Sequence, residues 1–325
     1  MATSTRCYFC RSTCKSTQLI RTILKKHEYE QDILFNNGFY DSRSCGNDGE
    51  LDSKSIFPDG VDTSTQNDFD RWVLNNYTYP YNIQFEYRYS DKEAHVEYNV
   101  VPAEYDKSIA VAKLVKHLWV DAYNELLGRD FLRQYSPRMI QLIGSSEYKE
   151  DMSEVLGTAE GGMKIFLNKV NLLDIENPDL GLIKYYFIKT MFHEFGHILQ
   201  QTKDYSTDFK TISTDYQGPS WVNVGAYETM GSSEALKMGY ISAYASSEPG
   251  EDFVEILSFY VVYGKPYWEK MLELAGDSGS PKLLKKFALV KEYLSTKWSI
   301  DIDELEKIVQ RRMGDISELD LESLD

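Results

Sequence analysis

The chain has 325 residues, of which 42% are apolar and 26% are charged, and its formal net charge is −16. This composition is typical of a globular protein with a sizeable core, arranged as one large domain or as two packed lobes. The acidic charge, without a basic stripe, argues against a nucleic-acid-binding protein. No apolar run reaches the roughly 18 residues of a membrane span, so the sequence predicts no transmembrane segment.

Residues 1–64 differ from the rest and are predicted to be a disordered or targeting tail followed by a flexible linker. Residues 1–26 are basic and rich in Ser and Thr, which superficially suits a transit peptide, but they contain no continuous apolar segment of a secretory signal. All cysteines lie in the tail: Cys7, Cys10, Cys14 and Cys45. The first three, with His27, offer zinc donors, although a disordered tail is the simpler interpretation.

In the remainder, 65–325, the predicted strands precede most of the predicted helices. A helix is expected at 67–76, an alternating strand at 81–91 and a long helix at 107–128, and short strands follow at 138–144 and 161–172. Asn177 and Pro178 are typical of an N-cap and a first helical position, and their helix would run to about Gln201. After a polar loop at 202–222, helices are predicted at 233–244, 251–263, 281–295 and 302–313.

This order predicts an α+β fold with a mostly helical C-terminal half. We expect one domain at 65–325. Its N-terminal α/β lobe would cover about 65–201 and its helical C-terminal lobe about 202–325.

The helix that ends near Gln201 contains the sequence HEFGH. Residues four apart share a helix face, so His193 and His197 can hold one ion. Glu194 is rotated by about 100° from His193, where it can take a proton from a metal-bound water. Gly196 lowers helix propensity but leaves room for a ligand or a neighbouring strand. Because this pattern arises by chance in fewer than about one in a hundred such chains, it favours a zinc site.

A catalytic zinc ion needs a third protein ligand, and the other histidines all lie upstream. The segment EDFVE offers Glu251 and Glu255, which are one helical turn apart. We predict that Glu251 coordinates zinc and that Glu255 accepts the ring N–H of a liganding histidine. Both could instead be solvated charges, but apolar residues crowd the segment, and buried carboxylates need partners. Glu248 and Asp252 are the alternative ligands.

These motifs resemble those of the gluzincin metallopeptidases, especially the lethal-factor-like branch, in which a tyrosine precedes the glutamate ligand by about two helical turns. Tyr244 stands at that position before Glu251. The chain is more closely similar to the substrate import-associated zinc metallohydrolase lipoproteins of Bacteroidetes-type bacteria. The resemblance spans roughly 65–265 and rests on five stretches: WVLNNYTYPYNIQFEYRY, LIGSSEY, LGTAEGGMKIFLNKVN, FHEFGHILQ and GYISAYASSEPGEDFVEILS.

The resemblance implies a zincin-like metallopeptidase fold with a small mixed sheet and an active-site helix, and one zinc ion per chain. It also implies a lipidated cysteine, here Cys45, and hence an outer-membrane lipoprotein at the cell surface or in the periplasm, beside an outer-membrane nutrient-uptake complex. The chain departs from that pattern, because residues 1–44 lack a signal peptide and no leucine stands three residues before Cys45.

Together, the predicted zinc ligands and catalytic residues are those of a zinc peptidase that cleaves extracellular peptides or proteins. Glu194 would be the general base, and Tyr244 would donate to the developing oxyanion, with Tyr240 and Tyr227 as rivals. The strand in 161–172 suits a sheet edge that pairs with an extended substrate. A surface nutrient-binding lipoprotein without turnover and an amidase of cell-wall or sugar-linked amides are the alternatives. The intact Glu194 favours an enzyme, because a binding protein has no use for a base.

Overall fold

The computed structural model describes residues 65–89, 100–148, 154–155, 159–160, 163–224 and 233–324. They belong to one compact unit that spans Thr63–Asp325. The cysteine sites, the linker, His95 and Tyr227 lie outside the described residues, so the interpretations placed on them remain predictions. None of the described helices is both long enough and apolar enough to cross a membrane.

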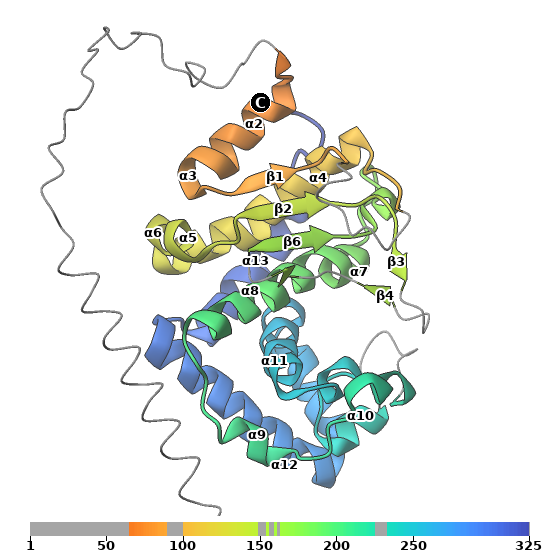
Figure 1. Ribbon diagram of the computed structural model, residues 1–325, viewed down its shortest axis with the longest axis vertical. Coiled ribbons are helices and arrows are strands. Elements are labelled where there is room, and N and C mark those ends of the chain that lie inside the picture. Colours follow the sequence, from red (N-terminus) through yellow and green to blue (C-terminus); the bar gives the residue numbers. More distant parts are fainter. Residues whose placement is uncertain are drawn as a thin grey trace, which may run out of the picture. The chain divides into compact units, whose positions relative to one another are not determined.

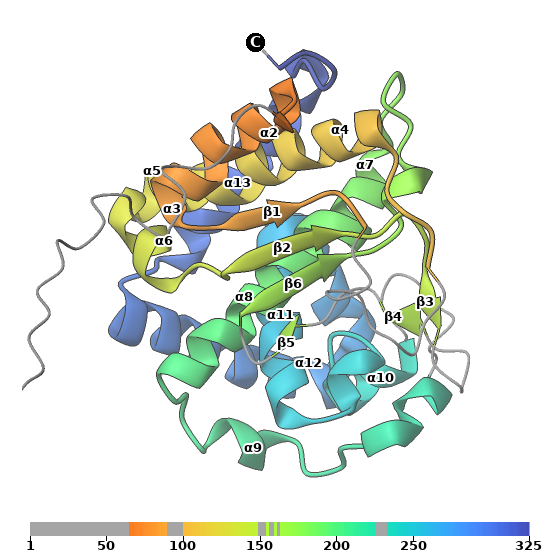
Figure 2. The same cartoon turned by 45° about the horizontal axis from the view of Figure 1, so that its top comes forward.

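A small sheet has the strand order β1-β2-β6-β5 (Figure 2). Strands β1 (Gln84–Glu86), β2 (Met139–Leu142) and β6 (Lys164–Leu167) are parallel, whereas β5 (Ala159–Glu160) runs antiparallel to β6. The sheet is therefore mixed, and the α+β class is confirmed. Strands β3 (Glu147–Tyr148) and β4 (Glu154–Val155) form a separate antiparallel pair.

The strands are shorter than predicted, and one has a different place in the sheet. The alternation at 81–91 is present, because Ile83, Phe85 and Tyr87 are buried, but only three residues pair as β1. Strand β6 was expected at an edge, yet it pairs with β2 on one side and with β5 on the other. The edge position beside β6 belongs to β5.

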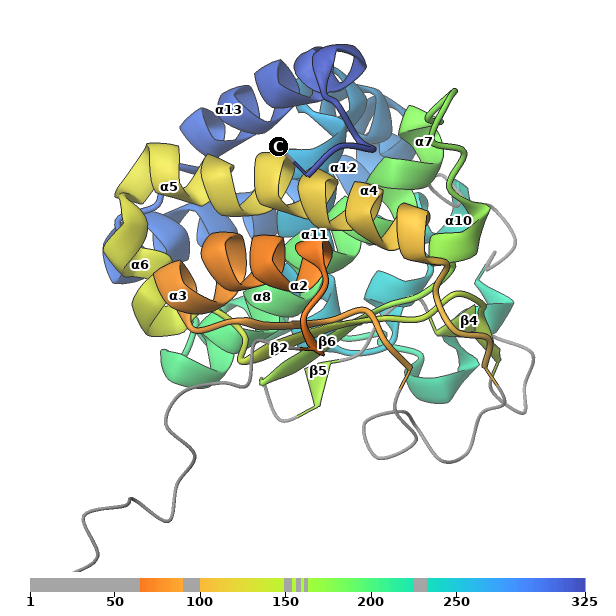
Figure 3. The same ribbon diagram turned by 90° about the horizontal axis from the view of Figure 1, so that it is seen from above.

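Helices of the N-terminal half lie on one side of this sheet (Figure 3). Asn67 caps α2 (Asp68–Val73) through a capping box with Asp70, and the helix continues through η2 (Leu74–Thr78) and α3 (Tyr79–Tyr81). The helix predicted at 107–128 is confirmed as α4 (Tyr105–Val115), η3 (Lys116–Val120) and α5 (Asp121–Leu127). Helix α6 (Arg129–Tyr135) then leads to β2.

The motif helix begins two residues later than predicted. Asp179 is the N-cap, and its Oδ1 accepts from the Gly181 backbone N–H at 2.7 Å. The Asn177 N–H instead donates to Asp174 in the preceding turn. After η4 (Val170–Leu172), the chain forms α7 (Leu180–Leu182), the π-helical η5 (Ile183–Ile188) and α8 (Lys189–Thr202) in one continuous run.

The second half is mostly helical, as expected. Two short helices, α9 (Phe209–Ile212) and η6 (Gly218–Asn223), lie in the predicted loop. The remaining elements are α10 (Ser233–Met238), η7 (Tyr244–Ser246), α11 (Pro249–Tyr263), α12 (Lys265–Trp298), α13 (Ile302–Gly314) and η8 (Asp315–Glu318). Helix α12 is much longer than the predicted helix at 281–295, and it is kinked at Gly276, whose φ is +60°.

Helix α8 lies between the sheet and α11 (Figure 1) and contacts both. Its apolar face packs on the α4–α5 helix, where Phe195 meets Trp119 edge to face and Phe192 contacts Tyr123. At Gly196 a Cβ atom would lie 2.8 Å from Cγ1 and 3.2 Å from Cβ of Val254 on α11. The glycine therefore makes room for a neighbouring helix rather than for a strand or a ligand.

Gly196→Ala is expected to destabilise the protein. Val254 is β-branched and buried, so it cannot turn its Cβ away from the new methyl group. We expect a net loss of roughly 1–2 kcal/mol in the free energy of unfolding, because overpacking outweighs the helix propensity gained. Urea unfolding measures this loss. A Val254→Ala background removes Cγ1 but keeps Cβ, so the same substitution should cost clearly less there, and an equal loss would contradict the close-approach explanation.

Candidate metal centre

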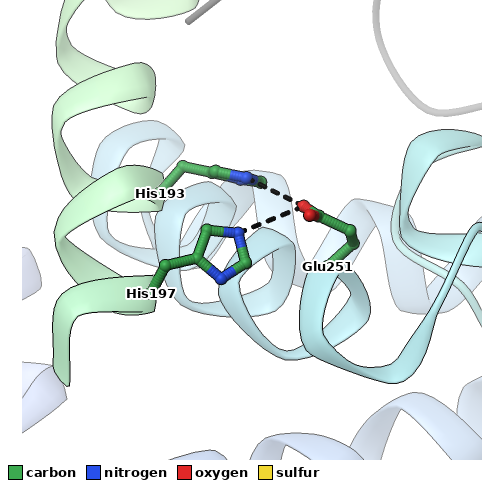
Figure 4. A group of neighbouring side chains, drawn as sticks. All are labelled: His193, His197 and Glu251. Carbon is green, nitrogen blue, oxygen red and sulfur yellow. Dashed lines mark hydrogen bonds and ion pairs between the residues drawn. The ribbon is translucent and has the colours of Figure 1, made fainter. Parts of the chain in front are cut away.

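Three predicted ligands converge where α8 faces α11. Figure 4 shows His193 and His197 projecting from one side of α8 toward Glu251 on α11. Glu251 Oε2 lies 3.0 Å from His193 Nε2 and 3.3 Å from His197 Nε2. One donor atom from each residue lies within 4.8 Å of the other two. The structure thus brings together the two histidines of the motif and the carboxylate predicted from a segment more than fifty positions away.

This donor set fits a zinc ion. Two imidazole nitrogens and one carboxylate oxygen form a common catalytic zinc set, which leaves a position open for water or substrate. Donors about 2.0 Å from a tetrahedral centre are about 3.3 Å apart, and both nitrogen–oxygen separations are close to that value. His193, His197 and Glu251 would therefore hold the ion without a large rearrangement.

Glu255 contacts the ring of His193 on the side away from Glu251. His193 Nδ1 lies 2.8 Å from Glu255 Oε1, and the carboxylate is 1% exposed. Two further donors reach that carboxylate: Lys189 Nζ at 2.5 Å from Oε1 and Ser242 Oγ at 2.6 Å from Oε2. Lys189 thus supplies the counter-charge that a buried carboxylate requires.

The electrostatics of His193 follow from its two carboxylate neighbours. Burial alone would lower the pKa of His193, but hydrogen bonds to Glu251 and Glu255 outweigh it and raise the pKa to about 10. Burial likewise opposes ionisation of Glu251, yet the two histidines hold the pKa of Glu251 well below its usual range. A metal ion must therefore displace a proton from His193 on binding, which makes metal affinity dependent on pH.

Known proteins include relatives of this chain. Residues 62–303 match the model of a family described as "Putative zinc-binding metallo-peptidase". The chain belongs to this family. It is also similar to a solved structure, "a putative zinc-binding metallo-peptidase from Bacteroides caccae ATCC 43185", with 39% identity and a TM-score of 0.67, over 83% of this chain and 100% of that chain. No curated protein matches the chain. Family membership supports a zinc metallohydrolase.

In this member of the zinc-binding metallo-peptidase family, Glu194 is buried beside the candidate metal ligands. It follows His193 directly on α8 and is 6% exposed. Burial raises the pKa of Glu194, while the neighbouring charges of His193 and His197 act in the opposite direction. A raised pKa brings a carboxylate closer to the range in which it can both accept and return a proton near neutral pH.

Tyr244 lies beside the metal centre, at the start of η7. Its ring centroid is 6.0 Å from that of His193, and Trp221 of η6 meets the Tyr244 ring edge to face at 5.0 Å. Burial, followed by the charges of Glu251 and Glu194, raises the pKa of Tyr244 far above its usual value. The phenol therefore keeps its proton, which it can donate to a nearby anion.

The alternative ligands have other surroundings. Glu248 is the exposed N-cap residue of α11. The Asp252 carboxylate is fully buried and accepts from Lys286 Nζ at 2.6 Å and from the Tyr216 hydroxyl at 2.8 Å. Neither residue joins the three-ligand group, so Glu251 is the carboxylate that the geometry selects.

Two other residues considered from the sequence also lie elsewhere. The hydroxyl of Tyr240 donates to Asp215 Oδ1 at 2.9 Å, and its ring lies 4.1 Å from Lys286 Nζ. His117 contacts Arg312 through both ring nitrogens. Tyr244 is therefore the described tyrosine that meets the centre.

The sequence did not predict several residues that contact the ligand histidines, Glu255 or Tyr244 around the metal centre. Lys189 stands one helical turn before His193, and this spacing can be read from the sequence. A lysine on a helix usually lies in solvent, however, so the spacing did not predict a buried contact. Gln200 stands three residues after His197, and its Oε1 is 3.3 Å from His197 Nδ1. Ser242 comes from an irregular segment and Trp221 from the short helix η6, and neither carries a spacing signal.

Proposed function

We propose that the protein is a zinc-dependent peptidase that hydrolyses peptide bonds with Glu194 as the general base. One observation carries the proposal: a buried carboxylate, Glu194, adjoins a complete set of three zinc donors on two packed helices. A structural zinc site is closed by four protein ligands and has no need of a neighbouring base, whereas this group has three donors among the residues that the structure describes.

The roles of the chain's own residues follow from their positions. Bound by His193, His197 and Glu251, zinc would act as a Lewis acid and lower the pKa of water toward neutrality. Glu194 accepts a proton from the attacking water and passes it to the amide nitrogen, which leaves as an amine. The Tyr244 hydroxyl donates to the carbonyl oxygen, where negative charge develops.

A peptide fits this arrangement better than a compact substrate does. The two-residue strand β5 forms the edge of the sheet next to β6. An extended chain can pair with such an edge through its backbone. Helix η6 brings Trp221 to Tyr244, and it is fixed to η7 by the Gln217 and Gly218 N–H groups, which donate to Ser246 and Ser247. Trp221 and Tyr244 thus form an aromatic surface beside His193. This surface supports a substrate whose side chains contact it.

Metal removal tests the proposal. The full chain should contain one zinc ion and cleave members of a random peptide library, measured by mass spectrometry. Treatment with a chelator should abolish cleavage, and added zinc should restore it. A library of amide-linked sugars or cell-wall fragments serves as the comparison substrate. A protein that holds zinc and retains peptides without cleaving them would instead be a binding protein, and one that holds no zinc would overturn the site.

A further inference from the structure

Gln200 contacts the second ligand histidine from behind. It lies on α8, three residues after His197, and its Oε1 is 3.3 Å from His197 Nδ1. The Nε2 atom of the same amide is buried and has no hydrogen-bond partner in the described part of the chain. The adjacent Gln201 is exposed. Gln200 and Gln201 are therefore adjacent residues of the same type, but Gln201 is exposed, whereas Gln200 has a buried amide nitrogen and contacts a ligand histidine.

The direction of this hydrogen bond follows from the chemistry of the ligand. His197 Nε2 faces Glu251 Oε2 at 3.3 Å, so Nε2 is the atom available to a metal ion. A neutral imidazole that ligates through Nε2 carries its proton on Nδ1, which can then only donate. Gln200 must therefore present its oxygen, and its amino group is turned into the interior. The unpartnered Nε2 is the consequence of holding the amide in this orientation.

The two ligand histidines are held by acceptors of different charge. His193 donates to Glu255, a buried carboxylate whose charge is paired with Lys189. His197 has the neutral amide of Gln200 in the equivalent place. An amide oxygen orients the ring without adding another buried negative charge beside Glu194 and Glu251, and buried charges need compensation.

We propose that Gln200 is the positioning residue of His197: it fixes the proton of the ring on Nδ1 and so presents Nε2 to the zinc ion. The inference rests on the zinc site of the proposed function. Groups that orient metal-ligating histidines in this way typically change metal affinity by about 10- to 100-fold when they are removed.

The test compares three variants by their zinc dissociation constants, measured by competition with a chromophoric chelator. Gln200→Leu removes the acceptor and should weaken zinc binding by roughly 10- to 100-fold. Gln200→Glu keeps an acceptor at the same place and should bind zinc within about threefold of wild type, or more tightly. Gln201→Leu alters the exposed neighbour on the same turn and should bind zinc as wild type does.

A second readout separates orientation of the ring from general destabilisation. The visible absorption spectrum of the cobalt-substituted protein should change in Gln200→Leu, because the His197 ring is no longer held, and should be unchanged in Gln201→Leu. Wild-type affinity in Gln200→Leu, or equal weakening in both leucine variants, would overturn the proposal. If Gln200→Leu does not fold, the zinc affinity of Gln200→Glu is the deciding measurement. Zinc binding weakened by more than about tenfold in that variant would contradict the role of residue 200 as the acceptor. Absence of zinc from the wild type would instead defeat the proposed function.

Discussion

Glu194→Gln should lose peptide cleavage by roughly 100- to 10,000-fold in kcat while it keeps one zinc ion per chain. The substitution preserves the size of the side chain but removes its ability to accept a proton. Because Glu194 is buried beside His193 and belongs to none of the three donor positions, the metal centre should remain intact. Initial rates on a cleaved library peptide, together with zinc content by atomic spectroscopy, measure both effects.

A matched control comes from the same region. Glu248→Gln makes the same chemical change at an exposed residue at the start of α11 and should leave both activity and zinc content unchanged. If Glu194→Gln retains wild-type activity, Glu194 is not the base. If it loses the metal along with the activity, its contribution is to the stability of the centre rather than to proton transfer.

Lys286→Met should lower the free energy of unfolding by roughly 3–5 kcal/mol, the cost of breaking a buried ion pair by removing one partner. Lys286 and Asp252 are both fully buried, and their Nζ and Oδ2 atoms are 2.6 Å apart. Burial raises the pKa of Asp252 to about 6 and lowers that of Lys286, so desolvation weakens the ionised form of both partners. Without Lys286, the carboxylate would be left with Tyr216 as its hydrogen-bond donor.

Urea unfolding of the metal-free protein is the measurement for Lys286→Met. The double variant Asp252→Asn/Lys286→Met removes both charges and should recover much of the loss, because no uncompensated charge remains. Lys285→Met, at the exposed neighbouring position of α12, should change stability by less than about 0.5 kcal/mol. A double variant as unstable as the sum of its single substitutions would show that the pair does not act as a unit.

The candidate metal ligands and Glu255 were predictable because each pair of residues follows the helical period within a short segment. His193 and His197 are four apart, as are Glu251 and Glu255, so local geometry places each pair on one face. The alternating strand and the 107–128 helix were found by the same kind of signal. Residues whose position depends on packing between segments could not be identified in this way.

The missed features each have a physical reason. Gln200 and Gln201 are identical in type and stand three and four residues after His197 on the same helix, so spacing alone does not decide which of them contacts its ring. The early part of α12 was missed because Gly276, Gly279 and Pro281 interrupt its pattern, although a kink accommodates them. The N-cap was misplaced because Asn177 and Asp179 are both good caps, and the Asp174 turn had already engaged Asn177.

Helix α11 has a consequence for how the chain folds. Within five positions it contributes a candidate metal ligand, Glu251, one half of the buried ion pair, Asp252, and the acceptor of His193, Glu255. A zinc ion held by both His197 and Glu251 would close a loop of more than fifty residues, like a cross-link that forms only after α8 and α11 have docked. Metal uptake would then report docking of α8 against α11, and the bound ion would add to the stability of that contact.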